Sequence, residues 1–176
     1  MKKLSFILLL LVAGTAVVKA QSNVVKINIF SPIVRTFNVS YEHVVKKDAS
    51  FQLGFFYTGY SASGVSYTGL GITPEYRFYL SDTEAPAGVY VAPFLRYQNF
   101  TLKDDVNNKG TLSTFGGGVV LGKQWIFKNK FSLDGFVGPA YSSGTVKASS
   151  GSSTISTSGG LNGFGLRLGL TFGIAF

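Results

Sequence analysis

The sequence predicts an all-β protein, an eight-stranded antiparallel up-and-down transmembrane β-barrel. Eight segments alternate large apolar residues with small or polar ones, which is the two-residue period of a strand with one apolar face. Aromatic residues make up 15% of the 176 residues and charged residues only 14%, against about a quarter charged in ordinary soluble domains. Beyond residue 20 no apolar run approaches the roughly 18 residues that a spanning helix needs.

The chain is expected to divide into a signal peptide, residues 1–20, and a barrel domain, residues 21–176. Lys2 and Lys3 precede a long apolar stretch, and VKA before Gln21 has the small-residue pattern of a cleavage site. A transmembrane anchor is the alternative, but the length and flanks of the stretch favour a signal. Three lysines of this segment contribute to the formal charge of +8, so the barrel domain carries +5 (8 − 3).

Four strands are predicted in the first half of the barrel domain, over residues 24–30, 36–45, 51–60 and 67–80. The connections SPIVR, KKDAS and SASGVS separate them and are rich in turn-forming residues. Each strand has one apolar face. These faces carry, in chain order, Val25, Ile27 and Ile29; Phe37, Val39, Tyr41 and Val45; Phe51, Leu53, Phe55 and Tyr57; and Leu70, Ile72, Tyr76, Phe78 and Leu80.

Four more strands are predicted over residues 89–102, 112–126, 131–142 and 162–176. The connections are SDTEAPAG, KDDVNNKG, FKNK and a Ser/Thr/Gly-rich stretch over 143–160. Segments of about ten residues are long enough for tilted strands to cross a membrane, and short connections favour an antiparallel meander. The apolar faces carry Val89, Val91, Leu95 and Tyr97; Phe115, Val119, Leu121 and Trp125; Phe131, Leu133, Val137 and Tyr141; and Leu166, Leu168, Leu170, Phe172, Ile174 and Phe176.

The face opposite the apolar one decides between a membrane barrel and a soluble lipid-binding barrel. In the sixth strand it carries Gly116, Gly118 and Gly122, and in the eighth strand three further glycines with isolated polar residues. A solvent-exposed face would be rich in charge, whereas a narrow lumen needs small residues. Aromatic residues near strand ends suit the girdles at the membrane interfaces. The expected girdle residues are Tyr57, Tyr97, Trp125, Phe131 and Tyr141.

The connection lengths predict the sidedness of a bacterial outer-membrane protein. With both termini in the periplasm, the short turns KKDAS and FKNK are periplasmic, and the longer KDDVNNKG and 143–160 loops are extracellular. Pro74 and Pro93 remove ladder donors from adjacent strands of a barrel that has no edge, so a bulge or kink is expected at each. Pro139 is expected to act similarly in the seventh strand.

Charged residues on the lumen face form the main candidate site. Buried charges must be paired or hydrated. A plug of ion pairs is favoured because side chains can fill an eight-stranded barrel, and a gate or small polar pore is the alternative. The expected charge network comprises Lys26, Glu42, Glu75, Arg77, Arg96, Asp134 and Arg167.

Catalysis is not expected. His43 is the only histidine, and strand alternation sends it to the face opposite Glu42. A triad of the lipid A deacylase type would need both groups on one side. Cysteine is absent from the sequence, and DDVNN lacks the spacing of a calcium loop. Basic residues are scattered, which argues against nucleic-acid binding. No catalytic residue, metal site or cofactor is therefore predicted.

The motifs resemble a known family. INIFSPIVRTFNVSYEHVV, GITPEYRFYL, APFLRYQNF, GKQWIF, FSLDGFVGP and GLTFGIAF are similar to small outer-membrane barrels of Bacteroidetes-type bacteria and look like the DUF3575 family. The similarity spans residues 21–176. It implies a barrel in the outer membrane of a Gram-negative bacterium and supplies no activity and no catalytic residues.

The expected role is structural or one of surface interaction, and the barrel is expected to be a monomer. The alternatives are a narrow, porin-like passage for small polar or hydrophobic solutes and a lipid A-modifying enzyme. The expected partners are outer-membrane lipid, lipopolysaccharide and, during biogenesis, the barrel-assembly machinery. A terminal aromatic residue after an alternating strand resembles the signal that this machinery reads, which gives Phe172, Ile174 and Phe176 a role in assembly.

Overall fold

The computed structural model describes residues 22–62, 65–103, 109–148 and 163–176. The expected signal peptide and most of the 143–160 loop lie outside these residues. The described part contains eight strands and one short 3-10 helix. They are β1 (Asn23–Asn28), η1 (Ser31–Val34), β2 (Thr36–Lys46), β3 (Ala49–Ala62), β4 (Val65–Tyr79), β5 (Gly88–Lys103), β6 (Lys109–Phe127), β7 (Phe131–Ala148) and β8 (Gly163–Ala175).

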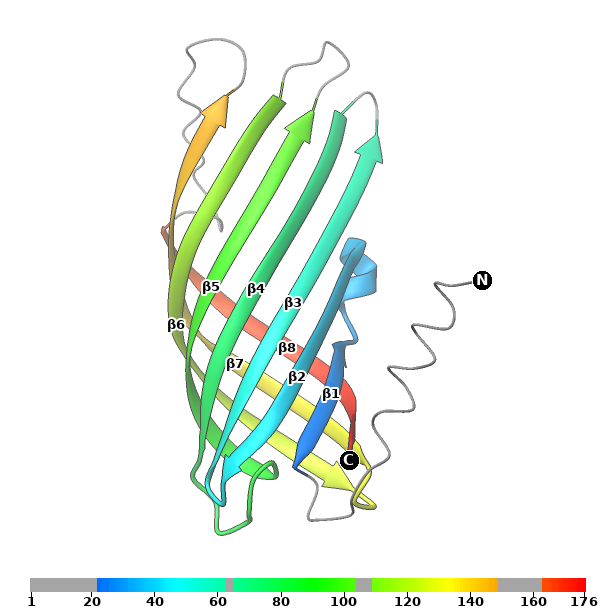
Figure 1. Ribbon diagram of the computed structural model, residues 1–176, viewed down its shortest axis with the longest axis vertical. Coiled ribbons are helices and arrows are strands. Elements are labelled where there is room, and N and C mark those ends of the chain that lie inside the picture. The colour runs from blue at the N-terminus through cyan, green and yellow to red at the C-terminus, as the bar shows by residue number, and fades with distance from the viewer. Residues whose placement is uncertain (1–21, 63–64, 104–108, 149–162) are drawn as a thin grey trace, which may run out of the picture.

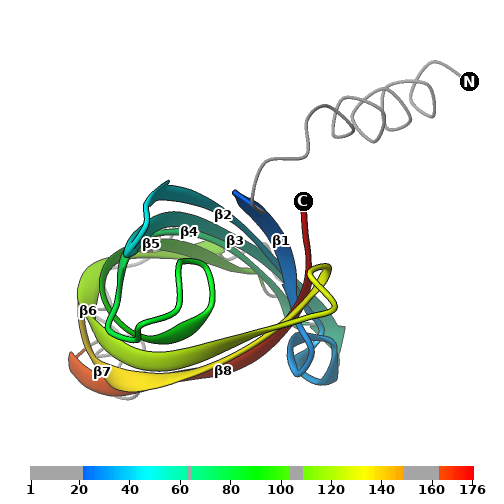
Figure 2. The ribbon, with the colours of Figure 1, turned by 90° about the horizontal axis from the view of Figure 1, so that it is seen from below.

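The strands form one closed barrel in sequence order (Figure 1; Figure 2). Every pairing is antiparallel, and β1 closes the barrel on β8 with Val25 opposite Ile174. Asn23 and Phe176 extend this seam. The Asn23 N–H donates to the Phe176 carbonyl at 3.0 Å, and the Phe176 N–H donates to the Asn23 carbonyl at 2.9 Å. The predicted eight-stranded up-and-down barrel is confirmed. Because the last strand pairs on both sides, every strand has two neighbours and no open edge remains.

Side chains alternate between the two sides of the wall as predicted. Phe55, Tyr57 and Leu95 are 44%, 50% and 53% exposed on the outer face. The residues that alternate with them along the strands point into the barrel. Inward-facing residues on other strands, such as Tyr90 and Val120, are fully buried. The outer face is therefore apolar and the inner face mixes polar, small and aromatic side chains. Among the described residues, no helix is long and apolar enough to cross a membrane.

The two ends of the barrel differ. At the turn end, short connections join β2 to β3, β4 to β5 and β6 to β7, and Phe176 lies nearby (Figure 1). At the other end, here the loop end, β6 and β7 extend to 19 and 18 residues. The sequence prediction began the sixth strand at residue 112 and ended the seventh at residue 142, because the polar and small residues beyond these points resemble loop. Pairing continues regardless, with Leu112 opposite Val146, since a neighbouring strand satisfies each backbone.

The first strand is shorter than predicted. β1 ends at Asn28, and η1 follows with Pro32 in its first turn. Arg35 ends η1 with a positive φ of 53°, in the left-handed region. A proline fixes φ near the helical value and has no N–H to donate, which suits the first turn of a helix and ends the ladder.

The bulges expected at the prolines are absent. Between β4 and β5 the register is unchanged across both prolines, with Ile72 opposite Tyr97 and Phe78 opposite Val91. Pairing is instead interrupted next to Pro74 and Pro93, and it resumes in register. The same holds at Pro139 in β7. The register shift between Val44 and Lys46, where β2 pairs with β3, is at the turn end and involves no proline.

The turn between β4 and β5 folds across the mouth of the barrel. Figure 2 shows this segment curling inside the outline of the wall at the turn end. Pro86 is buried, and Ala85 packs against the core cluster that contains Tyr79 and Tyr90. The Ala85 N–H donates to the Lys47 carbonyl across 2.8 Å. The predicted SDTEAPAG turn is longer than its neighbours because it covers the opening.

Candidate functional site

The lumen contains a compact cluster of charged side chains contributed by four strands. Alternation on β1, β2, β4 and β7 points Lys26, Glu42, Arg77 and Asp134 to the same inner face. The Lys26 ammonium lies 2.6 Å from Glu42 and 3.2 Å from Asp134, and Arg77 Nη1 lies 2.9 Å from Asp134. All four side chains are fully buried. Each charge therefore has an opposite charge within hydrogen-bond distance, as buried ions require.

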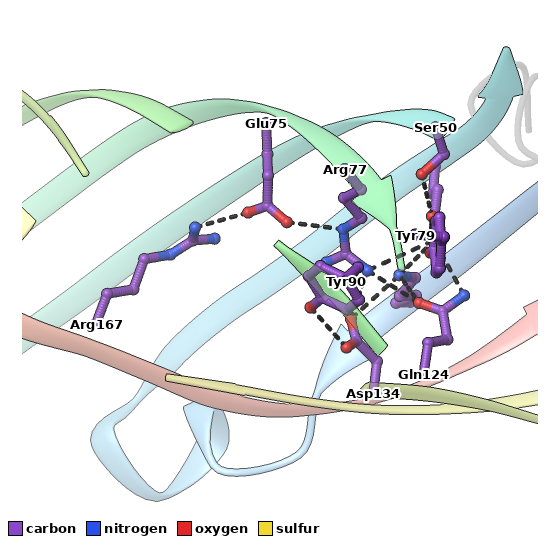
Figure 3. A network of polar contacts seen from close by, with 10 residues as sticks. Ser50, Glu75, Arg77, Tyr79, Tyr90, Gln124, Asp134 and Arg167 are labelled. Carbon is purple, nitrogen blue, oxygen red and sulfur yellow. Dashed lines mark hydrogen bonds and ion pairs between the residues drawn. The ribbon is translucent and has the colours of Figure 1, made fainter. Parts of the chain in front are cut away.

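Glu75 connects this cluster to the next level of the lumen. One carboxylate oxygen accepts from Arg77 Nε at 2.7 Å, and the other accepts from Arg167 Nη1 at 2.6 Å. Figure 3 shows Glu75 between the two guanidinium groups. The result is one continuous network that runs along the barrel axis from β8 to β1.

Neutral side chains complete the hydrogen bonding of the cluster. The amide oxygen of Gln124 accepts from Lys26 at 2.5 Å and from Arg77 at 2.9 Å, and its amide nitrogen donates to Glu42 at 3.1 Å. Tyr79 donates to Glu42 at 2.6 Å, Ser50 also donates to Glu42, and Tyr90 donates to Asp134 at 2.8 Å. The sequence prediction omitted these four residues because it selected formal charges. Their position on the inner face was the available signal.

Six of the seven predicted network residues are brought together, and their charges balance at three positive and three negative. Arg96 is the exception, because it has no ion pair with any described residue. Its guanidinium carbon lies 5.6 Å from the centre of the Phe94 ring. The lumen thus holds one partly buried cation more than the network neutralises.

Aromatic rings fill the lumen on the loop side of the network. Arg167 lies between Phe94 and Phe136, 4.2 and 4.8 Å from the ring centres. Further toward the loop end, Phe100 packs on Phe56 and Tyr67 with ring centres 6.1 and 5.5 Å away. A cavity of about 80 Å³ adjoins Arg167, Phe136 and Phe56.

His43 and Glu42 point to opposite sides of the wall, as predicted. Glu42 is buried in the lumen, whereas His43 is exposed and its Nδ1 lies 2.8 Å from Asn23 Oδ1. Tyr41 donates to the same oxygen at 2.6 Å. This arrangement ties the outer surface of β2 to β1 and brings no carboxylate to the imidazole.

The predicted girdle residues all lie on the outer face. Trp125 and Phe131 are near the turn end, where Phe131 stacks on Phe172 with ring centres 6.0 Å apart. The other three lie farther toward the loop end, and Tyr141 meets Phe164 at 5.0 Å. The proposed assembly residues Phe172, Ile174 and Phe176 also face outward, 40%, 48% and 44% exposed.

Comparison with protein families assigns this chain to a family. The family model described as "Protein of unknown function (DUF3575)" matches residues 6–172. The chain belongs to the DUF3575 family. The description of DUF3575 gives no activity, so the function of this member has to be argued from its lumen and its surface.

Two further comparisons concern individual proteins. No curated protein matches the chain. Among solved structures, the N-terminal β-barrel domain of Pseudomonas aeruginosa OprF is similar, with a TM-score of 0.45 and 16% identity over 90% of this DUF3575 chain and 100% of that domain.

Proposed function

We propose that this protein is a closed integral outer-membrane barrel with a structural or surface-interaction role, and that it neither conducts solutes nor catalyses a reaction. The observation that carries this proposal is the charge-balanced network of Lys26, Glu42, Glu75, Arg77, Asp134 and Arg167. A cross-section filled by paired, buried charges leaves an ion no favourable path, because a passing ion would have to break these pairs.

The outer surface supports a membrane location. Large apolar side chains cover it around the whole barrel, and few charges interrupt them. A water-soluble monomer rarely exposes an apolar patch larger than a few hundred Å². A lipid environment also requires every backbone polar group to be satisfied internally, which a closed barrel achieves. Trp125, Phe131 and Tyr141 lie where interfacial aromatics are expected.

Closure of the lumen rests on several successive layers. From the turn end these are the 81–87 segment, the pair Tyr79 and Tyr90, the charge network, and the rings around Arg167. Tyr79 and Tyr90 lie 5.5 Å apart, centre to centre. Their hydroxyl groups bond to network carboxylates, so the aromatic layer and the charged layer form one unit.

We propose the same sidedness as for other barrels of this type. The turn end and both termini face the periplasm, and the loop end faces outward. The support is the asymmetry of connection lengths and the extension of β6 and β7 at the loop end. Lipid and lipopolysaccharide then contact the wall, the assembly machinery acts on β8, and the protein functions as a monomer.

Liposome swelling tests the proposal. Liposomes containing the refolded protein are diluted into isotonic glycerol or glucose, and the proposal predicts swelling no faster than that of protein-free liposomes. A general porin reconstituted in parallel shows that the vesicles can report a pore, and blue-shifted emission of Trp125 verifies insertion. Swelling that increases with the amount of protein would contradict a closed barrel and favour the narrow passage.

A further inference from the structure

The cavity on the loop side of the charge network is lined mainly by polar groups. Gln52, Thr73 and Thr171 surround it, and Arg96 and Arg167 reach it from β5 and β8. A site for one water needs roughly 10–15 Å³. The observed 80 Å³ therefore accommodates several waters or one ligand of a few heavy atoms.

The charge at this cavity is positive. Arg167 is already paired with Glu75 at 2.6 Å, whereas Arg96 has no acidic partner in the described part of the chain. The Nε atom of Arg96 is buried and has no hydrogen-bond partner. The side chain of Arg96 is partly buried. An unpaired guanidinium in such a setting loses hydration without gaining a counter-charge, and a bound anion would supply that charge.

Two more side chains on the cavity wall have unused hydrogen-bonding capacity. Gln52 and Thr171 are only 4% and 7% exposed, and Gln52 Oε1 and Thr171 Oγ1 have no partner. Buried polar atoms are nearly always hydrogen-bonded in folded proteins. Both side chains are therefore free to bond to a ligand in the cavity, as donors if the Gln52 amide is turned so that its nitrogen faces the ligand. The Thr171 hydroxyl and, after rotation, the Gln52 amide group can donate to it.

We propose that this cavity is a binding site for one small oxyanion, of the size and chemistry of acetate. Arg96 holds the ligand by paired N–H donors, since the planar guanidinium fork matches a carboxylate. Thr171 and Gln52 donate to the remaining oxygen positions, and Arg167 adds positive charge from the far side. The anion balances the extra cation of the lumen. The site adjoins the ion-pair network at Arg167, and its occupation does not depend on whether the barrel conducts.

Calorimetric titration of the refolded barrel tests the site, with sodium acetate as the probe at constant ionic strength. We expect saturable binding of one acetate, weakened tenfold or more by Arg96→Gln, because hydrogen bonds to charged groups contribute about 1.5–3 kcal/mol. Thr171→Val removes one hydroxyl with little change of shape and should weaken binding severalfold. Lys123→Gln removes the same charge from the outer surface, beside Trp125, and should leave binding unchanged.

Gluconate serves as the size control, since it carries the same carboxylate on a body too large for the cavity. Absence of saturable acetate binding to the wild-type barrel would overturn the proposal and leave the cavity to water. Equal affinity for gluconate, or equal acetate affinity in wild type and Arg96→Gln, would also overturn it. If Arg96→Gln does not refold, the Thr171→Val variant decides, and unchanged affinity there refutes the site.

Discussion

Arg77 is the residue whose loss most directly perturbs the lumen network. Its Nε contacts Glu75 at 2.7 Å, and its Nη1 contacts Asp134 and Gln124 at 2.9 Å each. Arg77→Met keeps an unbranched side chain that matches the aliphatic stem of arginine, and it leaves three carboxylates facing two cations. Removal of one partner of a buried ion pair costs about 3–5 kcal/mol. We predict a loss of this size in the free energy of unfolding.

The charge imbalance, rather than lost packing, is the predicted cause. Asp134→Asn has the opposite imbalance, three cations and two carboxylates, and should cost about the same. The double variant restores balance, since Lys26 remains with Glu42 and Arg167 with Glu75. Its destabilisation should therefore be smaller than the sum of the two single losses by about 1–3 kcal/mol, which is within the range found for residues in one network.

Urea unfolding of the refolded barrel in lipid vesicles measures these energies, with Trp125, the single tryptophan of the sequence, as the fluorescent reporter. Lys47 and Glu84 provide a control pair, 3.5 Å apart with side chains 89% and 65% exposed. The same double-variant cycle there should give a coupling below about 1 kcal/mol. Strict additivity of Arg77→Met and Asp134→Asn, or single losses as small as the control, would refute the reasoning.

Three further predictions concern glycine packing, His43 and the last strand. Gly138→Ala should destabilise the barrel by about 1–3 kcal/mol in urea, because its Cβ would collide with the backbone of Val119 and lie 2.6 Å from Val120 Cα. Gly135→Ala, whose Cβ would meet only Leu170 at 3.5 Å, should change stability by less than about 0.5 kcal/mol, and equal effects would contradict the packing argument. His43→Ala should leave the mass spectrum of cellular lipid A unchanged, and loss of a modification would establish an enzymatic role. Phe176→Ala keeps the backbone bonds to Asn23, so it should reduce the amount of assembled barrel in cells more than the urea stability of refolded protein; equal reductions would argue against an assembly signal.

The sequence was sufficient for the features that depend on strand period. Alternation assigned both faces of the wall, and the same alternation placed Lys26, Glu42, Arg77 and Asp134 together in the lumen. It also separated Glu42 from His43. Each of these conclusions needs only the rule that successive side chains point to opposite faces and that neighbouring strands pair.

Other features depend on three-dimensional fit and were beyond the sequence pattern. Pro74 and Pro93 were expected to force a bulge or a kink, yet the closed barrel keeps its register without a bulge and interrupts the ladder locally. The turn over 81–87 gave no sign that it folds across the mouth. The pattern also did not show that Glu75 pairs with Arg167 and not with Arg96, because that choice depends on the tilt and stagger of the strands rather than on residue type.

The most direct test of whether buried ion pairs close the lumen is single-channel recording in a planar lipid bilayer. We expect no stepwise conductance from the wild-type protein after its insertion has been verified. Stepwise conductance that Arg96→Ala or Arg167→Ala abolishes would contradict it, because the lumen would then be a pore whose arginines control ion passage.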